Sequence, residues 1–205
     1  MGCRQQAGTS SFASPELIEP LIHSIVWRRI DKPGHEYCVL REAENGFRMS
    51  GVAIVTNDKA PHCVEYEVQC DGLWRTLRCR ISEHGGSDRV DFDIRREEAA
   101  WTLNGVEVPG VSFCQDIDFG FSPATNLLSI RRLQLAVGQN AVVRAAWVRF
   151  PEFTLEPLEQ TYTRVDTTTY RYESDNGRFK KELKVSEDGF VLDYPGLWVA
   201  ESAAR

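Results

Sequence analysis

The chain has 205 residues, with 24 lysine and arginine residues against 30 aspartate and glutamate residues, which gives a net charge of −6. This acidic balance argues against a nucleic-acid-binding protein, whose affinity depends on a basic surface, and against electrostatic docking on an anionic membrane. Hydrophobic residues make up 42% of the chain. That is an ordinary share for a globular protein, and a chain of this length folds around its own core without a metal or a disulfide.

Residues 1–20 are polar, and we expect them to form a disordered N-terminal tail. They lack the basic and apolar regions of a secretory signal, and no apolar run reaches the roughly 18 residues of a membrane-spanning helix. We therefore expect a cytoplasmic protein whose six cysteines stay reduced. No two cysteines have the spacing of a zinc site, so we expect neither a metal nor a cofactor.

Alternating apolar and polar residues predict β-strands along most of the chain. Asp71-Gly72 predicts a tight turn between strands at 63–70 and 73–81, and Asn104-Gly105 predicts a type I′ hairpin within Trp101–Val108. Further strands are expected at residues 22–30, 36–41, 47–56, 89–95, 115–119, 141–150, 159–165, 169–173, 179–185 and 190–194. Because no helices separate most of these strands, the pattern predicts one antiparallel meander.

One segment, residues 123–133, predicts an α-helix. Ser122 is suited to the N-cap and Pro123 to the first helical position. An apolar stripe follows at Ala124, Leu127, Ile130 and Leu133. The predicted fold is therefore mainly β, with a single domain at residues 21–200 and a short C-terminal tail at 201–205.

Asp116 and Asp118 lie two residues apart on a predicted strand, so their side chains share a face, about 6.5 Å apart. Three interpretations remain open: a catalytic carboxylate pair of a glycosidase, a face paired with Arg131 and Arg132, or acceptors for sugar hydroxyls in a concave site. Glu36, which follows a Pro-Gly turn, is either a polar ligand contact or a polar residue at the start of a strand.

The five tryptophans are candidates for core packing or for the walls of an apolar pocket. We expect core packing for Trp101 and Trp147, and both roles stay open for Trp27, Trp74 and Trp198. No nucleophile elbow, phosphate-binding glycine loop or nucleotide-binding fingerprint is present.

Several blocks of the sequence carry a family resemblance: Trp27-Arg28-Arg29, residues 33–38, 68–71, 74–76, 101–105, 116–128, 130–133, 143–147 and 193–198. In this order and combination, from about Val26 to Trp198, they resemble a bacterial glycolipid-binding family that was long a domain of unknown function. The resemblance implies an extended antiparallel sheet curled around one helix, distantly like the lipoprotein carriers of the bacterial envelope. It also implies homodimers, an acidic pocket and a role in glycolipid metabolism. Ser129 stands where the family would have proline.

Three hypotheses for the function follow. The first is a non-catalytic glycolipid-binding protein with an acidic, aromatic-lined pocket. Its expected ligand-binding residues are Trp27, Glu36, Trp74, Asp116, Asp118, Asn126, Arg131, Arg132, Tyr194 and Trp198. The second is a glycoside-processing enzyme that uses Asp116 and Asp118, and the third is a dimeric interaction module without a ligand. We also predict that Arg131 or Arg132 is largely buried and paired with one of these aspartates, because a buried guanidinium needs a partner.

Overall fold

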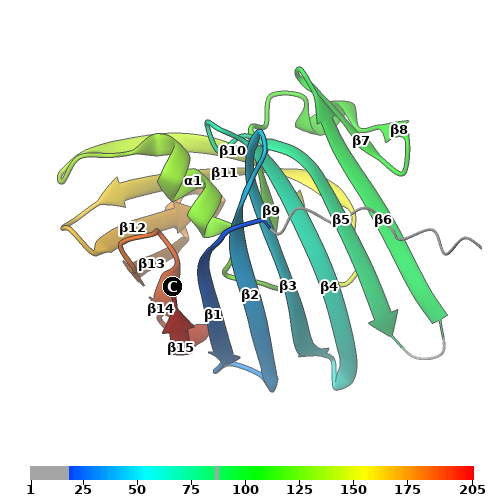
Figure 1. The fold of residues 1–205 in the computed structure, drawn as a ribbon, viewed down its shortest axis with the longest axis horizontal. Helices are drawn as coiled ribbons and strands as arrows, with labels where there is room; N and C mark the ends of the chain where they lie inside the picture. The colour runs from blue at the N-terminus through cyan, green and yellow to red at the C-terminus, as the bar shows by residue number, and fades with distance from the viewer. Residues whose placement is uncertain (1–18, 86–87) are drawn as a thin grey trace, which may run out of the picture.

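Fifteen β-strands form one continuous sheet in the computed structural model, which describes residues 19–85 and 88–205 (Figure 1). The sheet order runs from β8 back to β1 and then from β15 back to β9. The strands are β1 (Leu21–Arg29), β2 (Gly34–Ala43), β3 (Gly46–Asn57), β4 (Ala60–Asp71), β5 (Thr76–Gly85), β6 (Asp88–Glu97), β7 (Ala100–Leu103), β8 (Val106–Glu107), β9 (Asp116–Phe119), β10 (Asn140–Val148), β11 (Leu155–Arg164), β12 (Thr169–Ser174), β13 (Phe179–Val185), β14 (Val191–Tyr194) and β15 (Trp198–Ala204). Two short 3₁₀ turns, η1 (Pro109–Val111) and η2 (Asp175–Gly177), and one helix, α1 (Asn126–Leu133), complete the described elements.

The alternation of the sequence sets the two faces of the sheet. On β4, Val64, Tyr66 and Val68 are buried, whereas Glu65 and Glu67 lie on the other face. Neighbouring strands pair antiparallel throughout, except that β9 and β10 are parallel. The expectation of a mainly β fold is therefore confirmed, and the expectation of a purely antiparallel sheet is wrong at β9, which the chain joins to β10 through α1.

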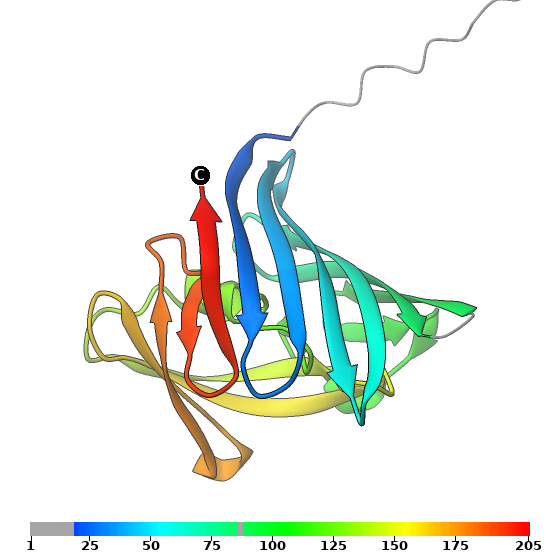
Figure 2. The same cartoon turned by 90° about the horizontal axis from the view of Figure 1, so that it is seen from below.

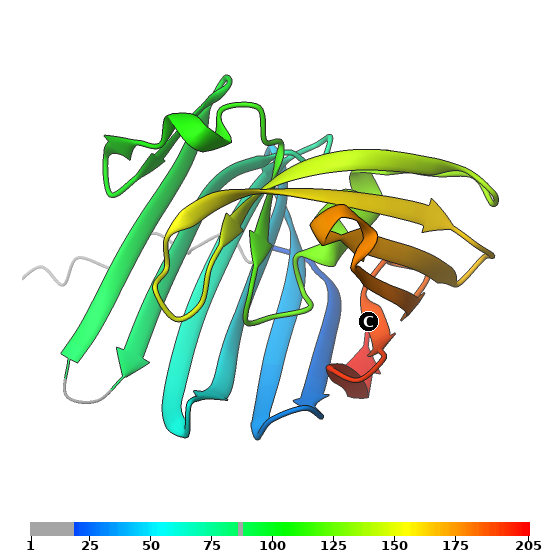
Figure 3. The same ribbon diagram turned by 180° about the vertical axis from the view of Figure 1, so that it is seen from behind.

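The sheet curls into an open roll around α1. Strands β10 and β11 run across the direction of β2–β5 (Figure 3), and the view from below shows the sheet curving about the helix (Figure 2). The edge strand β9 returns to the start of β5, where the Thr76 amide donates a 3.3 Å hydrogen bond to the Gln115 carbonyl and the Thr76 hydroxyl accepts one from the Ile117 amide at 3.1 Å. The curl gives α1 a concave face on which to bury its apolar stripe.

Helix α1 begins three residues later than predicted, because Ser122 has other partners. Its hydroxyl accepts a hydrogen bond from the Ala124 amide at 3.0 Å and donates one to Glu36 at 2.6 Å, which holds this segment in a turn. Thr125 therefore occupies the N-cap position, and Gln134 ends the helix in the left-handed conformation.

Strand β5 begins at Thr76, three residues after the predicted start, because Asp71 organises a wider loop. The Asp71 carboxylate accepts hydrogen bonds from the Leu73 and Arg75 amides, both at 2.9 Å. This loop places Trp74 in the left-handed conformation, at a φ of 65°. Trp74 is therefore a loop residue, and the two-residue turn predicted at Asp71-Gly72 is wrong.

Described residues of both predicted tails form hydrogen bonds with the sheet. Residues 201–204 belong to β15, which pairs with β1, so the prediction of a C-terminal tail is wrong for them. The polar and small side chains of this segment give little strand signal, and the hydrogen bonds of β1 determine its conformation. Of the predicted N-terminal tail, residues 1–18 lie outside the described residues, while the Pro20 carbonyl accepts a 3.0 Å hydrogen bond from the Glu42 amide.

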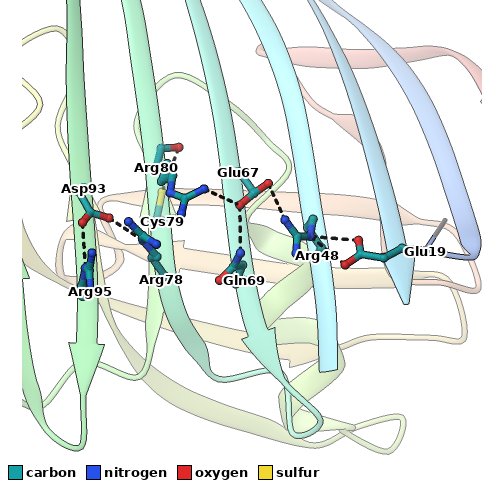
Figure 4. A network of polar contacts seen from close by, with 9 residues as sticks. All are labelled: Glu19, Arg48, Glu67, Gln69, Arg78, Cys79, Arg80, Asp93 and Arg95. Atoms are coloured by element: carbon teal, nitrogen blue, oxygen red, sulfur yellow. Dashed lines mark hydrogen bonds and ion pairs between the residues drawn. The ribbon is translucent and has the colours of Figure 1, made fainter. Parts of the chain in front are cut away.

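Charged side chains cover the outer face of β3–β6 (Figure 4). Glu67 accepts hydrogen bonds from Arg48 at 2.9 Å and from Gln69 at 3.0 Å, and Asp93 accepts hydrogen bonds from Arg78 at 2.6 Å and Arg95 at 2.8 Å. Pairs of opposite charge between adjacent strands are favourable on a sheet. The outer face is therefore the solvated one, and the apolar core lies on the concave face with α1.

The five cysteines in the described part of the chain are free thiols, as expected, and four of them are buried. Cys70 and Cys79 lie in the core as small apolar side chains. Within residues 19–85 and 88–205, no three histidine, cysteine, aspartate or glutamate side chains gather into a metal-binding group. Over the same residues, no helix has the length and apolar character to cross a membrane.

Candidate functional site

A pocket of about 550 Å³ lies beside the first turn of α1, against β9–β15. Six aromatic residues contribute to its walls: Phe119, Trp147, Tyr172, Phe179, Tyr194 and Trp198. Five polar residues also line it: Asp118, Ser122, Asn126, Ser174 and Asp175. The pocket thus combines apolar walls with a small set of hydrogen-bonding groups, which is the usual composition of a small-molecule site.

Asp118 is the half-buried acid of this pocket. Gln160 holds it by donating a 2.9 Å hydrogen bond from Nε2 to its Oδ2, and the same nitrogen lies 3.0 Å from the Tyr172 hydroxyl. Burial, with a further contribution from the negative charge of Asp116, raises the pKa of Asp118 to about 7. The carboxyl group therefore changes its charge close to neutral pH.

Asp116, two residues earlier on β9, has a different environment. Arg132 binds it at both oxygens, at 2.8 and 2.6 Å, and the Ser129 hydroxyl donates a third hydrogen bond at 2.8 Å. The Asp116 side chain is 1% exposed and that of Arg132 is 16% exposed. The predicted pairing of a buried arginine with one of the two aspartates is therefore confirmed. Because Asp116 is bound by Arg132 and does not line the pocket, the Asp116–Asp118 pair of the glycosidase hypothesis is not free there.

Glu36 lies behind the pocket wall and contacts a residue of that wall, Ser122, through a hydrogen bond. The hydroxyls of Tyr66 and Ser122 both donate to its Oε1, at 2.5 and 2.6 Å, and Ser122 itself lines the pocket. Glu36 is 1% exposed, and burial raises its pKa to about 8, so it is a neutral acid at pH 7. Its second oxygen has no hydrogen-bond partner among the described residues.

Gly51 makes room for this buried cluster. A Cβ atom added at Gly51 would lie 2.5 Å from the Tyr37 carbonyl oxygen and would overlap the phenol of Tyr66. We expect Gly51→Ala to lower the free energy of unfolding in urea by about 1–3 kcal/mol, the range for overpacked cores. Gly110→Ala is the control, because its Cβ atom would meet nothing within 4 Å. Equal stabilities of the two variants would contradict this explanation.

Four of the residues proposed from the sequence lie together at this pocket: Asp118, Asn126, Tyr194 and Trp198. Asn126 is fixed by its neighbours, since its Oδ1 accepts a 2.9 Å hydrogen bond from the Tyr162 hydroxyl and its Nδ2 donates to the Pro123 carbonyl at 3.0 Å.

The other proposed aromatic residues lie elsewhere. Trp27 is fully buried and donates a 2.6 Å hydrogen bond to the Val191 carbonyl, so it is a core residue. Trp74 stacks on Phe47 with ring centroids 3.8 Å apart, and the Arg131 guanidinium lies 4.9 Å from its ring. Neither tryptophan lines the pocket beside α1.

Sequence reasoning missed much of the pocket wall. Trp147, expected in the core, lines the pocket and pairs in register with Asp118 across the parallel β9–β10 ladder. Tyr172 and Phe179 reach the same space from β12 and β13. Their strand patterns identify a buried face but carry no signal of an unfilled space beside it.

Comparisons with known proteins identify a family and similar solved structures. A family model described as "Putative glycolipid-binding" matches residues 24–200. The crystal structure of a DUF1089 family protein from Pseudomonas aeruginosa is similar with a TM-score of 0.71 and 26% sequence identity, covering 95% of this chain and 98% of that chain. A β-barrel-like protein of the domain of unknown function DUF1849 from Brucella abortus gives a TM-score of 0.44 and 11% identity, covering 91% and 98% of the two chains. No curated protein matches the chain. Because the family model spans most of the sequence, the chain belongs to the family described as "Putative glycolipid-binding".

Proposed function

We propose that the protein binds an amphiphile with a sugar head group, such as a glycolipid, in the pocket beside α1. One observation carries the proposal: the pocket joins six aromatic residues to a half-buried carboxyl group, Asp118, within about 550 Å³. This volume lies within the range of roughly 300–1,000 Å³ that is typical of small-molecule sites. It suits a head group and part of an alkyl chain.

The polar residues of the pocket match the chemistry of a sugar. Sugar hydroxyls donate hydrogen bonds to carboxylate oxygens, and only Oδ2 of Asp118 accepts a hydrogen bond from the described residues. The apolar faces of a sugar ring pack well on aromatic rings, and Trp147, Tyr194 and Trp198 supply such rings. Phe179 and Leu197 add apolar surface for the chain of the ligand.

We propose a non-catalytic role for this binding in glycolipid metabolism, in a cytoplasmic homodimer that needs no cofactor. Asp118 has the pKa of about 7 that suits a general acid, but the engagement of Asp116 with Arg132 favours binding over hydrolysis. Light scattering tests the dimer, and a panel of nitrophenyl glycosides tests the absence of turnover.

The direct test is titration calorimetry with n-octyl β-D-glucoside below its micellar concentration. We expect binding, and we expect Trp147→Ala to weaken it at least tenfold, which corresponds to about 1.4 kcal/mol. Val142→Ala, on the exposed face of the same strand, is the matched control and should bind normally. Asp118→Asn provides a second site variant if Trp147→Ala melts early. Equal affinities of all three variants, or no binding of alkyl glycosides at all, would contradict the proposal.

A further inference from the structure

The charges that line the pocket beside α1 are all negative. Asp118 and Asp175 contribute to the lining, and no lysine, arginine or histidine does so. Asp175 is exposed, so it stands at the solvent side, whereas Asp118 is half-buried within the pocket. A cleft lined by one sign of charge attracts ligands of the opposite sign.

Asp118 also lacks a cationic partner in the described part of the chain. Its one hydrogen bond comes from the neutral amide of Gln160, and its neighbour Asp116 adds repulsion rather than compensation. The only cation that binds β9 carboxylates among the described residues, Arg132, is bound to both oxygens of Asp116. Burial of a carboxylate without a countercharge is costly, so an incoming cation would be stabilised here.

Three of the aromatic rings that line the pocket already have a cation beside them. Arg149 lies 5.3 Å from the Trp147 ring, Arg29 lies 5.5 Å from Trp198, and Lys181 lies 5.8 Å from Phe179. None of the three lines the pocket. Arg149 and Arg29 bind Glu156 at 3.3 Å and Asp31 at 2.7 Å, which offsets their charge locally. These rings thus act as acceptors of cations, and the pocket presents further aromatic surface together with an uncompensated acid.

We infer that the head group bound in this pocket carries an ammonium group, as in an amino sugar, which Asp118 pairs with and the aromatic walls surround. This inference rests on the proposed function and specifies the head group of its ligand. An ammonium group donates charge-assisted hydrogen bonds to a carboxylate and is attracted to aromatic faces. Anionic head groups would be repelled by Asp118 and Asp175.

Three probes with eight carbon atoms each separate the possibilities: n-octylamine, 1-octanol and octanoate. Calorimetry at pH 7.5 should give octylamine at least tenfold tighter binding than octanol and give octanoate the weakest binding. Asp118→Asn should reduce the preference for octylamine over octanol to less than threefold. Asp91→Asn is the control, because it removes the same charge from an exposed position on β6.

The affinity for octylamine should also rise with pH between 6 and 8, because the amine stays charged while Asp118 ionises around its pKa of about 7. The titratable groups that face Asp118 are Asp116 on β9, Asp175 in the lining of the same pocket, and three buried tyrosines, Tyr162, Tyr172 and Tyr194. Burial raises the pKa of each tyrosine, so the tyrosines stay neutral in this range. The Asp118→Asn variant should lose the rise, and a Glu36→Gln variant, which removes the other acid that titrates near pH 8, should keep it.

The outcomes distinguish this inference from the function on which it rests. If octyl glucoside binds and Trp147→Ala weakens it, but octylamine binds no tighter than octanol, the ammonium inference is wrong and the proposed function stands. A preference for octylamine that Asp118→Asn leaves intact also overturns the inference. If neither octyl glucoside nor any of the three probes binds, both proposals fail.

Discussion

Replacement of Arg132 by methionine should lower the free energy of unfolding by about 3–5 kcal/mol. Arg132 is the bidentate partner of Asp116, whose side chain is 1% exposed. The substitution would leave a buried carboxylate with only the Ser129 hydroxyl as a side-chain donor. An uncompensated buried charge costs far more than the net contribution of the pair, which is the reason for the large effect. Urea denaturation at pH 7 measures the change.

The control for this variant is Arg144→Met. Arg144 pairs with Glu159 at 3.4 Å, and both side chains are about 60% exposed, so solvent screens the pair. We expect a loss of less than about 1 kcal/mol there. A similar loss of stability in both variants would contradict this account, because it would show that the burial of the ion pair does not determine the cost of breaking it. A double variant, Arg132→Met with Asp116→Leu, should recover part of the stability, since it removes both members of the buried pair.

The free energy of unfolding should decrease as pH rises, because the pKa of Glu36 is raised in the folded protein. Its pKa is about 8 in the folded protein against an ordinary value of 4.5, so the folded state binds more protons than the unfolded state between these values. The stabilisation that protonated Glu36 provides is therefore complete below pH 4.5 and is lost as pH rises toward 8. The slope is about 1.4 kcal/mol per pH unit, or about 4 kcal/mol between pH 5 and 8.

The Glu36→Gln variant isolates this effect, because glutamine keeps the acceptor for Tyr66 and Ser122 and cannot ionise. The free energy of unfolding of the variant, minus that of the unmodified protein, should increase by about 4 kcal/mol from pH 5 to pH 8. Glu42→Gln, at an exposed position of the same strand, serves as the control for the loss of one acidic residue. A difference curve that stays flat over this range would contradict a neutral Glu36.

Most strands of the fold could be predicted, because period-two alternation is a local property of the sequence. Buried Val64, Tyr66 and Val68 on β4 show the expected alternation. The sequence carries no comparable local pattern for the pairing of strands that are distant along the chain. The parallel contact of β9 with β10 and the attachment of residues 201–204 to β1 depend on the hydrogen bonds of partner strands.

The candidate site could be predicted only in part, for a related reason. Asp118 could be predicted because it stands two residues from Asp116 on a predicted strand, and Asn126 because it lies on the helix that follows this strand. Trp27 and Trp74 could not be told from Trp147 by sequence alone, since all three are large aromatic residues in or near strands. What separates them is whether neighbours fill the space around the ring, as Phe47 and Arg131 do for Trp74.

A crystal structure of the protein soaked with n-octyl β-D-glucoside would test the central claim most directly, because it locates the ligand. We predict a sugar ring within hydrogen-bonding distance of Asp118, packed against Trp147 or Trp198, with the alkyl chain along the apolar wall near Phe179. A ligand seated elsewhere on the molecule, with the pocket beside α1 left without it at saturating concentration, would contradict the account.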